Sequence, residues 1–255
     1  MELLPGVALV GSGWLGMSLS DRDDCHVYLV HDGDDAILID AGCGRASDAI
    51  VQRIQAVGVA PQSVSRILIT HAHPDHAAGA LSLAERLGAT VLASPQVADI
   101  LRRGDEDGAG LTVARAAGRY PTDVRLLPTP ATSCDDGDVL QVGSITVQVL
   151  ATPGHAIGHL CYVARLDVDP LGCKGGSVAV LFSGDLVFTR GRVAVLGTPD
   201  TDVAALADSL RRVAALRPQV LLPGHETVAL SDAPRHLDAA ISALDLQDLP
   251  PALLP

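Results

Sequence analysis

Four side chains that can bind a metal lie close together in one short segment. The sequence LITHAHPDHAAG (68–79) contains His71, His73, Asp75 and His76 directly after an apolar run. Imidazole nitrogens and carboxylate oxygens are ligands that zinc accepts, and a loop that leaves a strand can aim several of them at one point. Holding these polar groups together without a cation would be costly. The segment therefore predicts a metal site.

The spacing within this segment predicts two ligand groups. His71 and His73 are two residues apart, so in an extended loop their side chains face the same side. Pro74 follows, restricts the backbone and forces a turn. Asp75 and His76 can then face a second point close to the first. We expect two metal positions.

Three more candidate ligands follow one shared pattern of apolar strand, glycine and ligand. The glycine allows the backbone to turn sharply where each strand ends. These ligands are His155 in LATPGHAIG, Asp185 in LFSGDLVF and His225 in LLPGHE. Two metals need more ligands than the first segment supplies, and these residues provide them.

Strands and helices alternate in groups along the chain. The first half has the pattern of strands at 7–10, 25–30, 36–40 and 66–70, with helices from Ser47 or Asp48 to 57 and over 77–89. The second half predicts two strands within 139–154, strands at 159–166, 177–185 and 219–224, and helices at 201–216 and 233–246. Consecutive strands covered by helices indicate a mixed α/β fold with sheets packed face to face and helices outside.

Residues 94–132 fit this pattern least well. They are polar and rich in turns, and we expect an irregular or partly helical excursion that covers a pocket. Tyr120 lies in it and is a candidate for lining that pocket, with a packing role as the alternative. No linker divides the sequence, so we expect a single domain over 1–255.

Composition argues against several classes of protein. The formal net charge of −12 would repel a polyanion, so nucleic acid is not an expected partner. No stretch of about 18 uncharged apolar residues occurs, so no membrane span is expected. The apolar start has no basic flank and contains several glycines, which predicts a hairpin and not a signal sequence.

Cysteine usage points to a reducing compartment. The odd number of cysteines and the absence of a CxxC pair predict buried, reduced thiols and a cytoplasmic protein. They are Cys25, Cys43, Cys134, Cys161 and Cys173.

The segments HAHPDH, TPGH, SGD and PGHE resemble, in this order, those of the metallo-β-lactamase superfamily. The resemblance extends over nearly the whole chain. It implies a four-layer αββα sandwich with a two-metal site at one edge of the paired sheets. Asp40 in LIDAG matches a position at which an aspartate supports the ligand loop in this family; a turn aspartate is the alternative.

The resemblance also assigns roles to the candidate ligands. It implies two Zn²⁺ ions per chain, with His71, His73 and His155 on the first, Asp75, His76 and His225 on the second, and Asp185 bridging both. Two such ions, roughly 3.5 to 4 Å apart, can hold a hydroxide between them and polarise a substrate carbonyl. The bridging hydroxide would attack, and Asp75 would be the catalytic residue that orients it or passes its proton on.

Departures from individual branches narrow the substrate class. The β-lactamases that resemble this fold have a cysteine or no acid at the position of Asp185, flavo-diiron proteins have glutamate at that of His73, and the nucleases add RNA-binding regions. The chain instead resembles hydroxyacylglutathione hydrolase (glyoxalase II) and lactonases, which implies a thioester, ester or lactone as a small-molecule substrate. Arg190 and Arg192 can meet a substrate carboxylate, with solvated loop charges as the alternative.

Two other functions stay open. The persulfide dioxygenases of this fold bind one Fe²⁺ through equivalents of His71 or His73, His155 and Asp185, but the complete second ligand set favours hydrolysis. A metal-binding domain without catalysis is disfavoured because structural zinc sites are usually closed four-ligand sites. Among the other histidines, His159 in GHAIGHLCY is expected to support a neighbour and not to bind metal.

Overall fold

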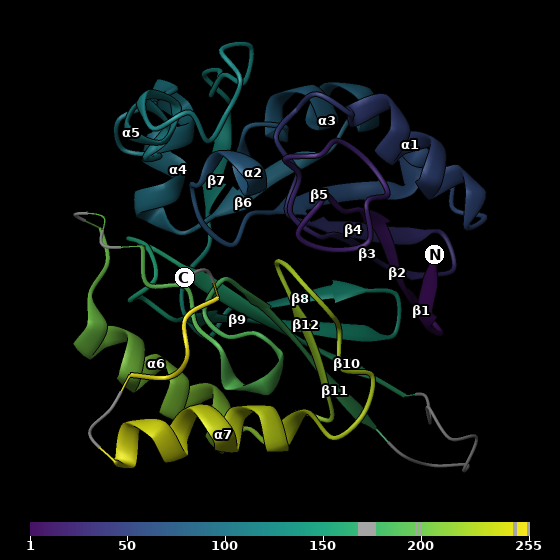
Figure 1. Cartoon of the computed structure of the whole chain (residues 1–255). Coiled ribbons are helices and arrows are strands. Elements are labelled where there is room, and N and C mark those ends of the chain that lie inside the picture. Colours follow the sequence, from purple (N-terminus) through teal and green to yellow (C-terminus); the bar gives the residue numbers. More distant parts are fainter. Residues whose placement is uncertain (168–176, 197, 199, 247–248, 254–255) are drawn as a thin grey trace. The chain divides into compact units, whose positions relative to one another are not determined.

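The structure of the chain is a computed structural model, and it describes residues 1–167, 177–196, 198, 200–246 and 249–253. Its contacts divide the chain into two compact units, Met1–Cys134 and Asp135–Pro255. Each unit contains one sheet and its own helices (Figure 1). The mixed α/β class predicted from the sequence, with two sheets and helices, is therefore confirmed.

The first unit is built on a seven-stranded sheet whose strands lie in chain order. The pairs from β1 to β4 are antiparallel, and those from β4 to β7 are parallel. The strands are β1 (Glu2–Leu4), β2 (Val7–Gly11), β3 (Val27–Asp32), β4 (Asp35–Ile39), β5 (Val64–Leu68), β6 (Thr90–Ala93) and β7 (Ala131–Ser133). The helices are α1 (Ser47–Ala56), η1 (Pro61–Ser63), α2 (Pro74–Ala77), α3 (Ala80–Leu87), α4 (Pro95–Arg103) and α5 (Leu111–Ala116).

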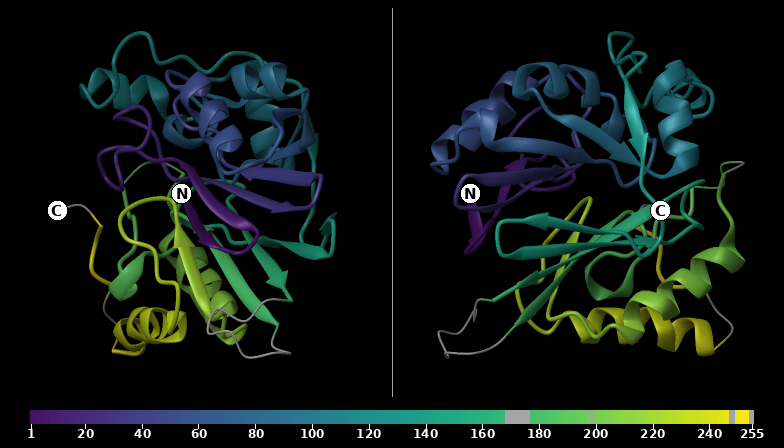
Figure 2. Two further views of the ribbon diagram at one scale, coloured as in Figure 1. Left: turned by 90° about the vertical axis from the view of Figure 1, so that its right-hand side faces the viewer. Right: turned by 180° about the vertical axis from the view of Figure 1, so that it is seen from behind.

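Apolar residues at helical spacing hold α1 and α3 against one face of this sheet (Figures 1 and 2). Ile50 and Ile54, one turn apart on α1, are buried in the same cluster as Leu83 of α3. Residues of the strands that share this cluster alternate along the chain, as Leu29 and Val27 do on β3. The strands repeat every two residues and the helices about every 3.6, and both direct apolar side chains into this one cluster.

The second unit has, in its described residues, a five-stranded sheet in the order β12-β11-β10-β9-β8. All its pairs are antiparallel except β11 with β12. The elements are β8 (Val139–Val142), β9 (Ile145–Ala151), β10 (Leu160–Leu166), β11 (Val178–Gly184), β12 (Val220–Pro223), η2 (Thr189–Gly191), α6 (Val203–Ala215) and α7 (Ala233–Asp245). Helices α6 and α7 lie side by side on one face (Figures 1 and 2), and their residues Leu210 and Leu237 share a buried cluster with Leu181.

Two boundaries differ from the predictions. The helix expected over 77–89 begins only at Ala80, because the Gly79 N–H donates to the Gly42 carbonyl at 2.8 Å and not to the preceding helical turn. The predicted end at Gly88 is confirmed, with φ of +71°. The excursion at 94–132 is partly helical, as expected, but its end already belongs to strand β7.

The four cysteines within the described residues are buried. Burial raises the pKa of the Cys161 thiol to about 12 and raises that of Cys25 as well. Cys173 lies outside the described residues, and the four cysteines within them form no disulfide. Among these same residues, no helix is long and apolar enough to cross a membrane.

Gly154 is the position at which a side chain would disturb the second unit most directly. Its φ is +134°, and an added Cβ would lie 2.2 Å from the backbone nitrogen of Leu206. We expect Gly154→Ala to lower the free energy of unfolding by more than about 3 kcal/mol, as measured by urea denaturation. Gly137→Ala is the matched control, because Gly137 also has positive φ, +89°, but no atom within 4 Å of the added Cβ. Its cost should be only about 1–2 kcal/mol, and equal losses for the two variants would contradict this account.

Candidate metal centre

The first group of candidate ligands lies where β5 ends. The chain leaves the sheet after Leu68, carries His71 and His73 in a loop and then enters α2 with Pro74 at its first position. The turn predicted from Pro74 is therefore the start of a short helix. His71 and His76 are fully buried, and His73 is 9% exposed.

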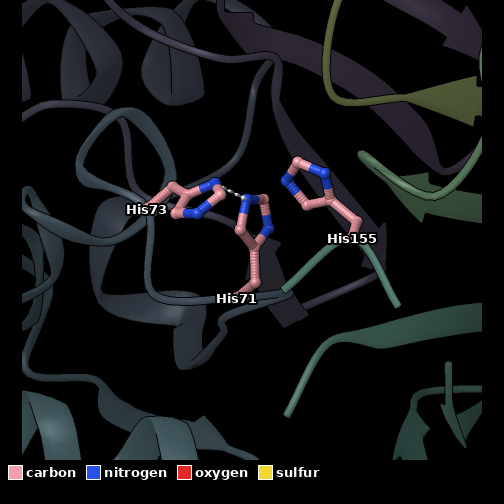
Figure 3. A group of neighbouring side chains, drawn as sticks. All are labelled: His71, His73 and His155. Carbon is pink, nitrogen blue, oxygen red and sulfur yellow. Dashed lines mark hydrogen bonds between the residues drawn. The ribbon is translucent and has the colours of Figure 1, made fainter. Parts of the chain in front are cut away.

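His71 and His73 direct ring nitrogens toward each other. The distance from His71 Nε2 to His73 Nδ1 is 3.1 Å, drawn as the dashed line in Figure 3. The two rings meet edge to face, with centroids 4.6 Å apart. Nitrogens so close together can both face a single cation, as the spacing of two residues predicts.

Asp40 organises this group from the end of β4. It is 2% exposed and has a φ of +62°, a left-handed conformation that is uncommon for any residue but glycine. Its Oδ1 accepts hydrogen bonds from the Thr70 N–H at 2.8 Å and from Thr70 Oγ1 at 3.0 Å. Its Oδ2 lies 2.8 Å from His76 Nδ1. Because an ionised carboxylate only accepts, His76 carries its proton on Nδ1 and presents the Nε2 lone pair as a ligand.

Thr70 extends the same control to His71. Its hydroxyl donates to Asp40, and it also lies 3.0 Å from His71 Nδ1. A hydroxyl whose single proton is used for the carboxylate must accept from the imidazole, so His71 is protonated on Nδ1 and presents Nε2. Thr70 was missed by the sequence analysis, although it stands next to His71 in the chain.

Asp75 has different neighbours on its two carboxylate oxygens. Its Oδ1 accepts a hydrogen bond of 2.9 Å from the Tyr120 hydroxyl. Its Oδ2 lies 3.7 Å from His76 Nε2. The backbone carbonyl of Asp75 accepts from the Cys25 N–H at 3.2 Å, and ligand atoms of Cys25, Asp40 and His76 all lie within 4.8 Å of one another. The buried Cys25 thiol is neutral, because burial raises its pKa.

The second unit brings together its own three candidate ligands. His155 follows β9, Asp185 follows β11 and His225 follows β12. Asp185 Oδ2 lies 3.8 Å from His155 Nε2 and 3.5 Å from His225 Nε2. His155 Nδ1 lies 2.8 Å from the carbonyl oxygen of Ala194, which assigns the proton to Nδ1 and the lone pair to Nε2. One carboxylate oxygen thus faces two imidazole nitrogens, a suitable arrangement for a shared ligand.

His159 supports this group, as expected. It is fully buried, and its Nε2 accepts a hydrogen bond of 3.3 Å from the backbone N–H of Asp185. Its Nδ1 lies 2.9 Å from Thr152 Oγ1. The His159 and His155 rings meet edge to face at 5.9 Å. His159 therefore holds the loop that carries Asp185.

The two arginines proposed for the substrate differ in their surroundings. Arg190 is exposed, with φ of +65°, and its backbone N–H donates to the buried His236 Nδ1 at 2.8 Å. Arg192 is half-buried and forms an ion pair with Glu226. Only the Arg190 guanidinium is directed to solvent. The sequence analysis gave no role to His236, whose distance of 46 residues from Arg190 hides the contact.

The donor atoms fit a metal. Each unit offers imidazole nitrogens in a defined tautomer together with carboxylate oxygens, a set that suits zinc and iron alike.

The chain belongs to the metallo-β-lactamase superfamily, whose family model matches residues 20–168. A hydroxyacylglutathione hydrolase of Acidiphilium cryptum is 31% identical over 225 residues, which cover 87% of this chain and 72% of that protein. Two solved structures have similar folds. A subclass B3 metallo-β-lactamase with an active-site glutamic acid has a TM-score of 0.68, with 24% identity over 95% of this chain and 86% of that chain. A subclass B3 enzyme of Bradyrhizobium japonicum has a TM-score of 0.71, with 20% identity over 97% and 90%.

These findings confirm the fold family inferred from the sequence motifs. Together with the histidine and aspartate groups, the family and its hydroxyacylglutathione hydrolase members support a metal-dependent hydrolase.

Asp40 offers the sharpest test of how these ligands are held. Asp40→Asn replaces one acceptor oxygen with an NH₂ donor, so either Thr70 or His76 loses its partner. We expect zinc affinity to fall about 10- to 100-fold and the free energy of unfolding to fall by about 1–3 kcal/mol. Zinc titration of the chelator-treated protein and urea denaturation measure the two effects. Asp34→Asn, an exposed change in the turn before β4, is the control. Unchanged zinc binding by Asp40→Asn would refute the role of Asp40.

Proposed function

We propose that this protein is a dinuclear zinc hydrolase that cleaves a thioester, ester or lactone. The observation that carries the proposal is the position of Asp185 Oδ2 between the Nε2 atoms of His155 and His225. A carboxylate oxygen that faces two neutral imidazoles suits a ligand shared by two cations. The first unit supplies the matching pairs, His71 with His73 and Asp75 with His76.

The proposed ligand set divides between two zinc ions. His71, His73 and His155 would hold the first, Asp75, His76 and His225 the second, and Asp185 would contact both. When bound, such ions lower the pKa of a water molecule and polarise a carbonyl oxygen. The domain that does this would extend over residues 1–255, with the two units as its halves.

The side chains of this chain would control the proton and the water. The Asp75 carboxylate lies next to His76 Nε2, and in the proposed reaction Asp75 takes the proton of the attacking water and passes it to the leaving group. Asp40 and the Ala194 carbonyl keep the imidazole protons away from the reaction, because they hold them on Nδ1 of His76 and His155. The burial of these histidines limits access of bulk water.

The proposed substrate class rests on the relatives and on the residue types present. The matching protein of Acidiphilium cryptum is named for hydrolysis of a hydroxyacylglutathione, which is a thioester. The likeness to β-lactamases concerns the fold alone, and Asp185 differs from the residue types that the β-lactamases resembling this fold have at that position. Arg190 can bind a substrate carboxylate, whereas Arg192 is engaged by Glu226. We propose a small-molecule substrate in the cytoplasm, with no nucleic acid or membrane as partner.

Metal content tests the proposal directly. Elemental analysis of the purified protein should find close to two zinc ions per chain, and a panel of thioesters, esters and lactones should include a substrate. A single tightly bound iron with activity on a persulfide would replace the proposal with a mononuclear dioxygenase. Bound metal with no turnover on any of these substrates would favour a domain that binds metal without catalysis.

Asp75→Asn tests the proton transfer. The change keeps the size of the side chain but removes its charge and basicity, so turnover should fall at least about 100-fold. The circular dichroism spectrum should stay that of the unaltered protein, and Asp34→Asn should retain activity. Full turnover by Asp75→Asn would rule out the proposed role of Asp75.

A further inference from the structure

Tyr120 connects the excursion to the candidate metal ligands of the first unit. It lies in the segment 105–125, here called the Tyr120 segment, and is half-buried. Its hydroxyl donates to Asp75 Oδ1 at 2.9 Å, across 45 positions of sequence. A lining residue would only border a pocket, but this hydroxyl engages a proposed ligand atom directly.

The end of α5 turns the chain so that Tyr120 points back. Gly118 follows the helix with φ of +72°, and the N–H of Arg119 donates to the Ala114 carbonyl at 2.9 Å. A left-handed glycine with this hydrogen bond is the Schellman ending of a helix, which reverses the chain direction within two residues. Tyr120 directly follows Arg119, so the helix ending determines its position.

A network centred on Glu106 fixes both ends of the segment. Glu106 accepts from Arg115 Nη1 at 2.9 Å and from Arg125 Nε at 2.7 Å. Arg115 Nη2 also donates to the Val124 carbonyl at 2.7 Å. The hydrogen bond from Arg115 holds the pKa of Glu106 at about 2, so the network is charged at neutral pH. Residues before and after Tyr120 are thereby tied to one carboxylate.

The hydrogen bond from Tyr120 distinguishes the two oxygens of Asp75. Oδ1 accepts the hydrogen bond from the Tyr120 hydroxyl, whereas Oδ2 lies 3.7 Å from His76 Nε2, the proposed partner on the second zinc. A carboxylate can bind a metal through either oxygen or both, so a donor fixed on one oxygen selects the other.

We propose that Tyr120 is a positioning residue that fixes the Asp75 carboxylate and reserves Oδ2 for the metal. This inference rests on the proposed function, because it takes Asp75 as a ligand of the second zinc. It assigns to the excursion a task beyond covering a pocket: the Tyr120 segment completes the second metal position.

The test is binding of Co²⁺ to chelator-treated protein, followed by its visible absorption spectrum. The first equivalent should bind Tyr120→Phe and the unaltered protein equally well. The second should bind Tyr120→Phe about 10- to 100-fold more weakly, with a changed spectrum, because Asp75 can then rotate and bind through either oxygen. Arg119→Ala is the matched control, since Arg119 is the exposed neighbour of Tyr120.

A second variant keeps the test valid if Tyr120→Phe does not fold. Glu106→Gln weakens the network but leaves the Tyr120 hydroxyl in the chain, and it should weaken the second equivalent in the same direction by a smaller factor. Equal weakening of both equivalents would indicate general loosening and overturn the positioning role. Binding of the second equivalent by Tyr120→Phe with unaltered affinity and spectrum would also overturn it.

The same titration distinguishes failure of the proposed function from failure of the Tyr120 inference. If the unaltered protein binds fewer than two Co²⁺ ions, the proposed dinuclear function fails and the Tyr120 inference fails with it. If the unaltered protein binds two and Tyr120→Phe matches it, only the inference fails.

Discussion

The carboxylate of Asp40 is the group on which the first set of candidate ligands depends. Asp40 is buried, and its backbone is in the left-handed conformation, which costs about 1–3 kcal/mol for a residue other than glycine. It is held there because its two oxygens accept from the Thr70 backbone, the Thr70 hydroxyl and His76. Through Thr70 it also orients His71. One side chain at the end of β4 thus sets the tautomers of two histidines from the next loop, which no local propensity could do.

In the second unit, a backbone carbonyl and not a carboxylate orients the His155 imidazole. The Ala194 carbonyl holds the proton of His155 on Nδ1, and His159 binds the backbone N–H of Asp185. A neutral carbonyl raises the basicity of an imidazole less than a carboxylate does. His76 should therefore be the stronger metal ligand of the two histidines.

The sequence predicted those parts of the site that depend on local order. A strand, a glycine and a polar residue lie within a few positions of one another, so His155, Asp185 and His225 could be named as candidate ligands, and so could the residues from His71 to His76. It did not predict contacts between distant segments. Tyr120 and Asp75 are separated by 45 residues, and nothing in the polar, turn-rich residues 94–132 indicated that Glu106 would tie the segment together. The later start of α3 was also missed, because it depends on the hydrogen bond from the Gly79 N–H to the distant Gly42 carbonyl.

Charge and geometry act together in the excursion. The Tyr120 hydroxyl donates to Asp75, and the segment that carries it is held by Glu106, which accepts from Arg115 and Arg125. A pKa of about 2 keeps Glu106 ionised through the whole physiological range, and protonation would remove the acceptor only in strong acid. The segment is therefore held by a charge network that is permanent at neutral pH. In the proposed dinuclear site, the Tyr120 segment would select between the two oxygens of Asp75, a choice that the ligand residues alone leave open.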